Sequence, residues 1–258
     1  FGVEAAVLVI TVIAVSIVQR GWDVANVPLA SVRVPILARL HAEKDEARFL
    51  LIQRLMVIIV IYTSISMGII VLTLFEPLLG LLYGKQYFLA VSWAIPIATL
   101  AVFFNMFSLG NSTIRQVEQY WPIVAGIMMT TIVMATVLFT SVSTLTPSRL
   151  PPLAVGAYVL GRGFFWLFTD LWTDYAVFRW QGTELKVRAV AAAGITMLLL
   201  YFGTEASTHF LWRGGLAAAG LLTFLLLFRL FGGVGHEARQ AIENLVNGRV
   251  SNKWLQLL

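Results

Sequence analysis

The amino-acid sequence predicts an all-α membrane protein with about seven transmembrane helices. Of its 258 residues, 59% are hydrophobic and 12% are charged, whereas an average soluble domain carries roughly 25% charged residues. Several apolar runs also reach the ~20 residues that a helix needs to cross the ~30 Å hydrocarbon core of a bilayer. A water-soluble fold is therefore not the interpretation that we favour.

Each predicted span is an apolar run bounded by proline, glycine or polar residues. The first run continues through Pro28 and Pro35, and because proline removes a backbone donor and kinks a helix, we expect a bent first helix. Membrane helices tolerate such bends where neighbouring helices re-satisfy the freed carbonyl. The predicted spans cover residues 2–36, 55–75, 88–110, 121–139, 153–172, 187–203 and 214–231.

The links between the spans are short. Glu76 and Pro77 open a link that contains Gly84 and Lys85. The link over residues 140–152 is rich in serine, threonine and proline, which suits an exposed connection.

The final residues, 232–258, are polar enough to leave the bilayer. Ala238, Ile242 and Leu245 recur at helical spacing before Gly248, which is a helix stop signal. We interpret this segment as an amphipathic cytoplasmic tail that lies on the membrane surface, with a helix that binds a protein partner as the alternative.

The Lys and Arg residues fall mainly on one side of the predicted membrane. Residues 27–54, which join the first two spans, carry five of them, and short loops rich in Lys and Arg face the cytoplasm. We place this stretch in the cytoplasm and let each following span cross the membrane in turn. Of the 18 Lys and Arg residues, thirteen then lie on the cytoplasmic side, three lie on the outer side and two fall within spans. We therefore predict a multi-pass protein of the plasma (inner) membrane whose C-terminus is cytoplasmic.

Enzymatic, metal-binding and nucleic-acid-binding functions find little support. The chain has no Cys, which excludes disulfides, thiol nucleophiles and thiolate metal sites. His41, His209 and His236 are isolated and lack the ligand spacing of a metal site. The net charge of +5 is explained by the loops between spans, so that nucleic acid is not an expected partner. We expect no catalytic site and no cofactor.

Four stretches, taken in order, resemble a known family. Residues 34–40 (VPILARL) resemble the P-x-L-(S/A)-R motif with which an even-numbered helix of that family ends. Residues 43–48 resemble the short charged cytoplasmic loop that follows it. Residues 76–87 are similar to its outer link, P-L-L-x-L-L-(F/Y)-G-x-x-Y, and residues 154–161 to its G-A-A helix start. Over residues 1–172 the chain thus resembles the C-terminal half of a polysaccharide flippase of the multidrug/oligosaccharidyl-lipid/polysaccharide exporter superfamily.

This resemblance implies that the seven spans correspond to helices eight to fourteen of a two-lobed transporter with fourteen helices. It implies alternating access, with an undecaprenyl-pyrophosphate-linked sugar or a similar lipid-linked glycan, such as an O-antigen precursor, as the substrate. The chain departs from the family because the first half is absent and because residues 19–23 form an insertion. Since the chain begins at Phe1 without Met, we interpret it as a fragment whose N-terminal lobe is a missing partner.

Charged residues within the spans are the first candidates for a binding site, because a charge at the bilayer centre costs roughly 2.5–3.5 kcal/mol on insertion scales. Arg20 and Asp23 are three residues apart, so they share a helix face and can pair. We predict that they face a central aqueous cavity. The alternative is a helix end at which Gly21 breaks the helix and Trp22 anchors it at the interface.

Arg162 lies within the fifth span between Gly161 and Gly163, which permit close backbone approach. An arginine holds a pyrophosphate or a carboxylate in a bidentate manner, which is the chemistry that a pyrophosphate-linked sugar presents. We predict a substrate-binding role for Arg162. Pairing with Asp170 or Asp174 and snorkelling to the interface are the alternatives.

Four further residues are weaker candidates. Trp166 lies inside the same span and is placed to stack on a sugar. Asn105 is a candidate cavity ligand, with hydrogen bonding between helices as the alternative. Asp170 and Asp174 are four residues apart and are candidates for a site that couples transport to a cation or a proton, with a hydrated helix end as the alternative.

Three other functions are alternatives to a flippase. A membrane enzyme of polysaccharide assembly is expected to show a large outer loop with polar catalytic residues, and the longest outer link, residues 140–152, has only 13 residues. A drug exporter of the same superfamily is expected to carry acidic residues for cation coupling, for which only Asp170 and Asp174 qualify. A scaffold lobe that does not transport is the third.

Overall fold

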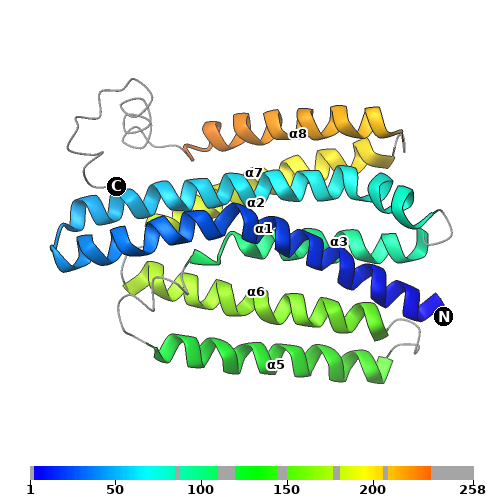
Figure 1. The fold of residues 1–258 in the computed structure, drawn as a ribbon, viewed down its shortest axis with the longest axis horizontal. Helices are drawn as coiled ribbons and strands as arrows, with labels where there is room; N and C mark the ends of the chain where they lie inside the picture. Colours follow the sequence, from blue (N-terminus) through cyan, green and yellow to red (C-terminus); the bar gives the residue numbers. More distant parts are fainter. Residues whose placement is uncertain are drawn as a thin grey trace.

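The computed structural model describes residues 3–84, 88–109, 120–144, 150–176, 181–205 and 209–233. Within these ranges the chain is all-α and contains no strand, as the apolar runs predict. The helices, labelled as in Figure 1, are α1 (Val3–Ala42), α2 (Glu46–Tyr83), α3 (Phe88–Asn105), α5 (Trp121–Thr144), α6 (Leu150–Ala176), α7 (Gln181–Glu205) and α8 (Phe210–Leu230).

Several of these helices have the length and composition of membrane-spanning segments. Among the described residues, four helical stretches are long and apolar enough to cross a bilayer: Arg48–Leu82, Trp121–Thr140, Gly182–Glu205 and Phe210–Leu230. Helices α5, α7 and α8 also leave large apolar side chains exposed, among them Phe139, Phe202 and Leu230. Because soluble monomers rarely expose large contiguous apolar surfaces, this exterior is compatible with a multi-pass membrane protein.

The first two helices form a long hairpin. α1 remains helical through Pro28 and Pro35 and ends at Ala42, beyond the predicted end of the first span at residue 36. Residues 43–45 make the turn, and the Asp45 carboxylate then accepts the backbone N–H of Arg48 at 3.2 Å, which caps the start of α2. We call this end of the bundle, where α6 also finishes and α7 begins, the hairpin end (Figure 1).

Helix α2 is longer than its apolar pattern predicts. It continues through Glu76 and Pro77, which the sequence placed in a link. One residue of this last turn, Leu79, is buried against α1 and α3, whereas Leu81 and Leu82 are exposed. The helix ends where Gly84 adopts a φ of +81°, a conformation that favours glycine, and donates its N–H to the Gly80 carbonyl at 3.0 Å.

Helix α3 is shorter than predicted. The apolar run over residues 88–110 suggested one continuous span, but the helix ends at Asn105 and residues 106–108 form a turn. The N–H groups of these three residues bond to carbonyls three positions earlier, at 3.0–3.3 Å. Met106 and Phe107 are nevertheless buried. The turn therefore lies inside the bundle although it is not helical.

The helices pack in layers (Figure 1). α1, α2 and α3 pack against one another, α6 lies against α3 and α1, and α5 packs mainly on α6. On the opposite side, α7 and α8 pack on each other and on α2, with a core that includes Ile61, Ala189, Phe224 and Phe228. The polar residues considered below lie where α1, α2, α3, α6 and α7 come together.

Small residues hold α5 close to α6. The Thr130 hydroxyl donates to the Gly161 carbonyl across the interface at 2.9 Å. A Cβ atom at Gly161 would lie 2.6 Å from Met134, so that only glycine fits at this approach. Close helix contact through small residues and interhelical hydrogen bonds is typical of membrane bundles. The predicted tail over residues 232–258 lies outside the described residues except for Gly232 and Gly233.

Candidate functional site

Helix α6 carries a polar stripe along one face. Arg162, Trp166, Asp170 and Asp174 follow one another at intervals of four residues, which places them on the same side of a helix. The stripe is about 18 Å long at 1.5 Å of rise per residue. It therefore passes from the interior of the bundle to the hairpin end and joins two separate pockets.

The first pocket lies between α1, α3 and α6 and is called here the Arg162 pocket. It encloses about 200 Å³ of empty space, including its open side. Its lining consists of Gln19, Ala101, Phe104, Asn105, Val159, Arg162 and Trp166. The structure thus brings together three of the predicted site residues, Arg162, Trp166 and Asn105, from two helices that are far apart in the sequence.

Arg162 stacks on Trp166 in this pocket. The guanidinium carbon lies 4.3 Å from the centroid of the indole ring, within the range of a cation–π contact. Among the described residues, Arg162 has no carboxylate partner and no hydrogen bond. The stacking orients the cation without neutralising it. It also occupies the indole face on this side, so that a sugar has only the other face of Trp166 to stack on.

Asn105 supplies a second donor without an acceptor. Its side chain is 1% exposed, and its Nδ2 atom has no hydrogen-bond partner among the described residues. A buried donor left unsatisfied costs about 1–3 kcal/mol. The Arg162 pocket therefore presents two donors whose acceptor the described protein does not supply, which is the arrangement of a site for an oxyanion.

Gly163 gives the pocket its aromatic wall. A Cβ atom at this position would lie 2.2 Å from the ring of Phe104, so that the ring lies directly against the backbone of α6. The two glycines beside Arg162 allow close approach of two different helices. Gly163 lies against Phe104 of α3, and Gly161 lies against Met134 of α5.

Arg20 and Asp23 lie outside this pocket. Both are exposed on α1, and neither lines the pocket, whereas the preceding Gln19 does. The alternative of a helix end is wrong, because α1 continues without interruption for almost twenty residues beyond Asp23. Trp22 is buried in the core and is therefore no interfacial anchor.

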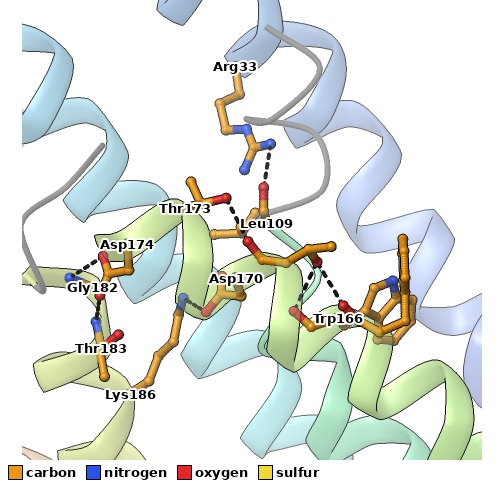
Figure 2. A network of polar contacts seen from close by, with 11 residues as sticks. Arg33, Leu109, Trp166, Asp170, Thr173, Asp174, Gly182, Thr183 and Lys186 are labelled. Carbon is orange, nitrogen blue, oxygen red and sulfur yellow. Dashed lines mark hydrogen bonds and ion pairs between the residues drawn. The ribbon is translucent and has the colours of Figure 1, made fainter. Parts of the chain in front are cut away.

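The second half of the stripe belongs to a buried ionic cluster (Figure 2). Lys186 of α7 donates to Asp170 of α6, and both side chains are about 5% exposed or less. Arg33 of α1, itself buried, donates to the Leu109 carbonyl at 3.4 Å directly after the turn that follows α3. The cluster therefore ties together helices α1, α6 and α7 and the end of α3.

Asp174 caps helix α7. Its carboxylate accepts the backbone N–H of Gly182 at 2.9 Å and that of Thr183, as Figure 2 shows. A carboxylate at a helix N-terminus satisfies free N–H groups and interacts favourably with the helix dipole. Both carboxylates that the sequence suggested for ion coupling thus have protein partners, Asp170 in Lys186 and Asp174 in the first turn of α7.

A second pocket of about 340 Å³, including its open side, lies next to this cluster at the hairpin end. Residues of α2, α6 and α7 line it, among them Gln53, Asp170, Thr173, Asp174 and Lys186. Gln53 is 5% exposed, and its Oε1 atom has no donor among the described residues. Sequence reasoning missed Gln19 and Gln53, although each is an uncharged polar residue beside a long apolar run.

Sequence reasoning also missed the ion pair at the opposite end of the bundle. Arg213 of α8 lies 2.7 Å from Glu76 of α2, and the arginine is buried. Both residues had been interpreted only as polar residues of outer links. This pairing explains how Arg213, in the first turn of α8, can be buried against the apolar helix α2.

No group of three or more His, Cys, Asp or Glu residues able to hold a metal ion occurs in the part of the chain that the structure describes. Comparison with protein-family models, with curated proteins and with solved structures gives no significant match to this chain.

Proposed function

We propose that this chain is one lobe of a membrane transporter that moves lipid-linked oligosaccharides across the plasma membrane, with the Arg162 pocket as the site for the phosphate group of the substrate. The observation that carries the proposal is that the Arg162 guanidinium and the Asn105 amide line one pocket and find no acceptor among the described residues. The sequence resemblance to polysaccharide flippases supports the substrate class.

The membrane setting follows from the composition and the fold together. The exposed apolar side chains suit a lipid-facing exterior, and the concentration of Lys and Arg in alternate links favours a cytoplasmic position for the hairpin end. In this proposal all seven helices cross the bilayer, including α1, α3 and α6. The polar stripe of α6 then lies inside the bundle, where charged side chains in membrane proteins mark substrate or ion pathways.

The geometry accounts for recognition of a phosphate. Trp166 holds the guanidinium of Arg162 in place, which leaves its N–H groups to donate to phosphate oxygens in a fixed orientation. Asn105 donates a further hydrogen bond from the opposite wall. In the described conformation the pocket has room for about one water molecule, so that a phosphate enters it only when α3 and α6 move apart. The sugar and the lipid tail extend away from the pocket, towards a second lobe and the bilayer. Rocking of the two lobes would expose the site to each side in turn.

Complementation of a flippase-deficient strain tests the proposal. Arg162→Ala is expected to lower complementation at least tenfold while the amount of protein in the membrane stays unchanged, because charge-assisted hydrogen bonds contribute about 1.5–3 kcal/mol. Arg229→Ala, which removes an exposed arginine at the end of α8, is the matched control and should complement normally. Normal complementation by Arg162→Ala would refute the proposal, and loss of the protein itself would assign Arg162 a structural role.

A further inference from the structure

The turn after α3 contacts both polar sites. Before it, Phe104 and Asn105 line the Arg162 pocket. Within it, the ring centroid of Phe107 lies 6.0 Å from the Nζ atom of Lys186. Just after it, the Leu109 carbonyl accepts the hydrogen bond from Arg33. A few consecutive residues thus connect the pocket with the Asp170–Lys186 pair.

Aromatic rings provide a continuous path of contact along this segment. The ring of Phe104 lies 5.8 Å from that of Phe103, and Phe103 lies 5.9 Å from Phe107, both in edge-to-face arrangements. On its other side, Phe104 packs on the backbone of α6 at Gly163. Because protein interiors are close-packed, a displaced ring in such a path moves its neighbour. A shift at the pocket therefore reaches Phe107.

The backbone of the turn is suited to such a shift. Its hydrogen bonds span three residues instead of four, and the one from Met106 to the Phe103 carbonyl is long, at 3.3 Å. Bonds of this type have poorer geometry than those of an α-helix, and short stretches of them often mark hinges. The turn separates the last helical residue of α3 from Leu109. It lies between the Arg162 pocket and the Asp170–Lys186 pair, whose other residues belong to regular helices.

We propose that the turn at residues 106–108 couples the Arg162 pocket to the Asp170–Lys186 ion pair. An oxyanion bound by Asn105 and Arg162 displaces the end of α3, and Phe107 moves away from Lys186, which lets water reach the buried ion pair and opens it. This inference rests on the ligand chemistry proposed for the pocket. By linkage, opening of the pair changes the affinity for the anion by the same factor.

Acetylation of Lys186 measures the state of the ion pair directly. The full chain in nanodiscs is treated with an uncharged acetylating ester, and each lysine is quantified by mass spectrometry while inorganic pyrophosphate is titrated. Lys186 is protected by burial, whereas the exposed Lys44 serves as an internal reference. Pyrophosphate should raise the rate at Lys186 about fivefold or more relative to Lys44. Pyrophosphate binding without any change at Lys186 would overturn the coupling.

Two variants locate the path. Phe107→Leu removes the ring but keeps an apolar side chain, so that pyrophosphate should still bind while the response of Lys186 is lost. Phe139→Leu makes the same change at an exposed position of α5 and should retain both. A full response of Lys186 in Phe107→Leu would refute the path through the ring.

A measurement without ligand separates this inference from the proposed function. Asn105→Ala removes a buried side chain at the last residue of α3, whose backbone carbonyl accepts the N–H of Ser108 in the turn, and should raise Lys186 acetylation in the absence of pyrophosphate. Thr131→Ala, at an exposed position of α5, should not. If pyrophosphate fails to bind but Asn105→Ala has this effect, the ligand assignment fails and the coupling stands. An unchanged rate in Asn105→Ala, with a normal melting temperature, overturns the coupling.

Discussion

Lys186 on α7 donates a hydrogen bond to Asp170 on α6, and both side chains are almost completely buried. This pair joins helices that otherwise contact each other little, and it lines the same pocket as Gln53, whose Oε1 has no donor in the part of the chain that the structure describes. Removal of one member of a buried pair leaves an uncompensated charge, which is far more costly than the loss of an exposed pair.

We therefore expect Lys186→Met to lower the free energy of unfolding by about 3–5 kcal/mol. The double variant Lys186→Met/Asp170→Asn should recover only part of this loss, because Asp170 also interacts electrostatically with the buried Arg33. Arg39→Met breaks the exposed pair with Glu43 and should change stability by less than about 1 kcal/mol. Denaturant titration in detergent distinguishes the three. Equal effects of Lys186→Met and Arg39→Met would show that the buried pair does not form.

Asp174 should behave as a helix cap. Asp174→Ala is expected to cost about 1–2 kcal/mol, whereas Asp174→Asn keeps an acceptor oxygen and should cost less. Hydrogen exchange should accelerate at the amides of Gly182 and Thr183, which donate to this carboxylate, and not in the middle of α7. Unchanged exchange at these two amides in Asp174→Ala would contradict the cap.

Two glycines offer a matched pair of substitutions. Gly163→Ala places a Cβ atom against Phe104, which should cost about 1–3 kcal/mol through overpacking and should distort the Arg162 pocket. Gly194→Ala, in α7, meets no atom within 4 Å and should be neutral or stabilising by up to about 1 kcal/mol. Thermal unfolding of both variants is the measurement. A neutral Gly163→Ala would mean that Phe104 does not lie against α6.

The pair between Arg213 and Glu76 should couple α8 to α2. Because the arginine is buried and the glutamate is partly exposed, Glu76→Gln, which removes the carboxylate partner of a buried cation, should destabilise the protein more than Arg213→Met, which removes the buried charge itself. A double-mutant cycle is expected to give a coupling energy of about 0.5–3 kcal/mol, and additive effects of the two changes would rule out a direct interaction.

The sequence predicted the helical class and much of the candidate site. Apolar runs located the described helices, and the cost of a charge in an apolar run drew attention to Arg162. Asn105 and Trp166 were found for the same reason, as polar or amphipathic groups within such runs. The structure places all three in one pocket.

The partners of these residues were not predictable, because they depend on which helices meet. Lys186 was counted as a loop base that sets orientation, yet it is buried against Asp170. The end of α3 was missed because Met106, Phe107 and Leu109 are as apolar as the helix before them, so that composition does not distinguish a buried turn from a continued helix. Pro77 was interpreted as a boundary, although α2 continues to Tyr83 and buries Leu79 against α1 and α3.

The most direct test of the account is lipid binding by the full chain in nanodiscs, with undecaprenyl pyrophosphate compared with undecaprenol, which lacks the phosphates. The pyrophosphate lipid should bind at least about tenfold more tightly, because a charge-assisted hydrogen bond contributes ~1.5–3 kcal/mol. This preference should be lost in Arg162→Ala and retained in Arg229→Ala. Equal binding of the two lipids by the wild-type chain, or a preference that survives Arg162→Ala, would contradict a phosphate site in the Arg162 pocket.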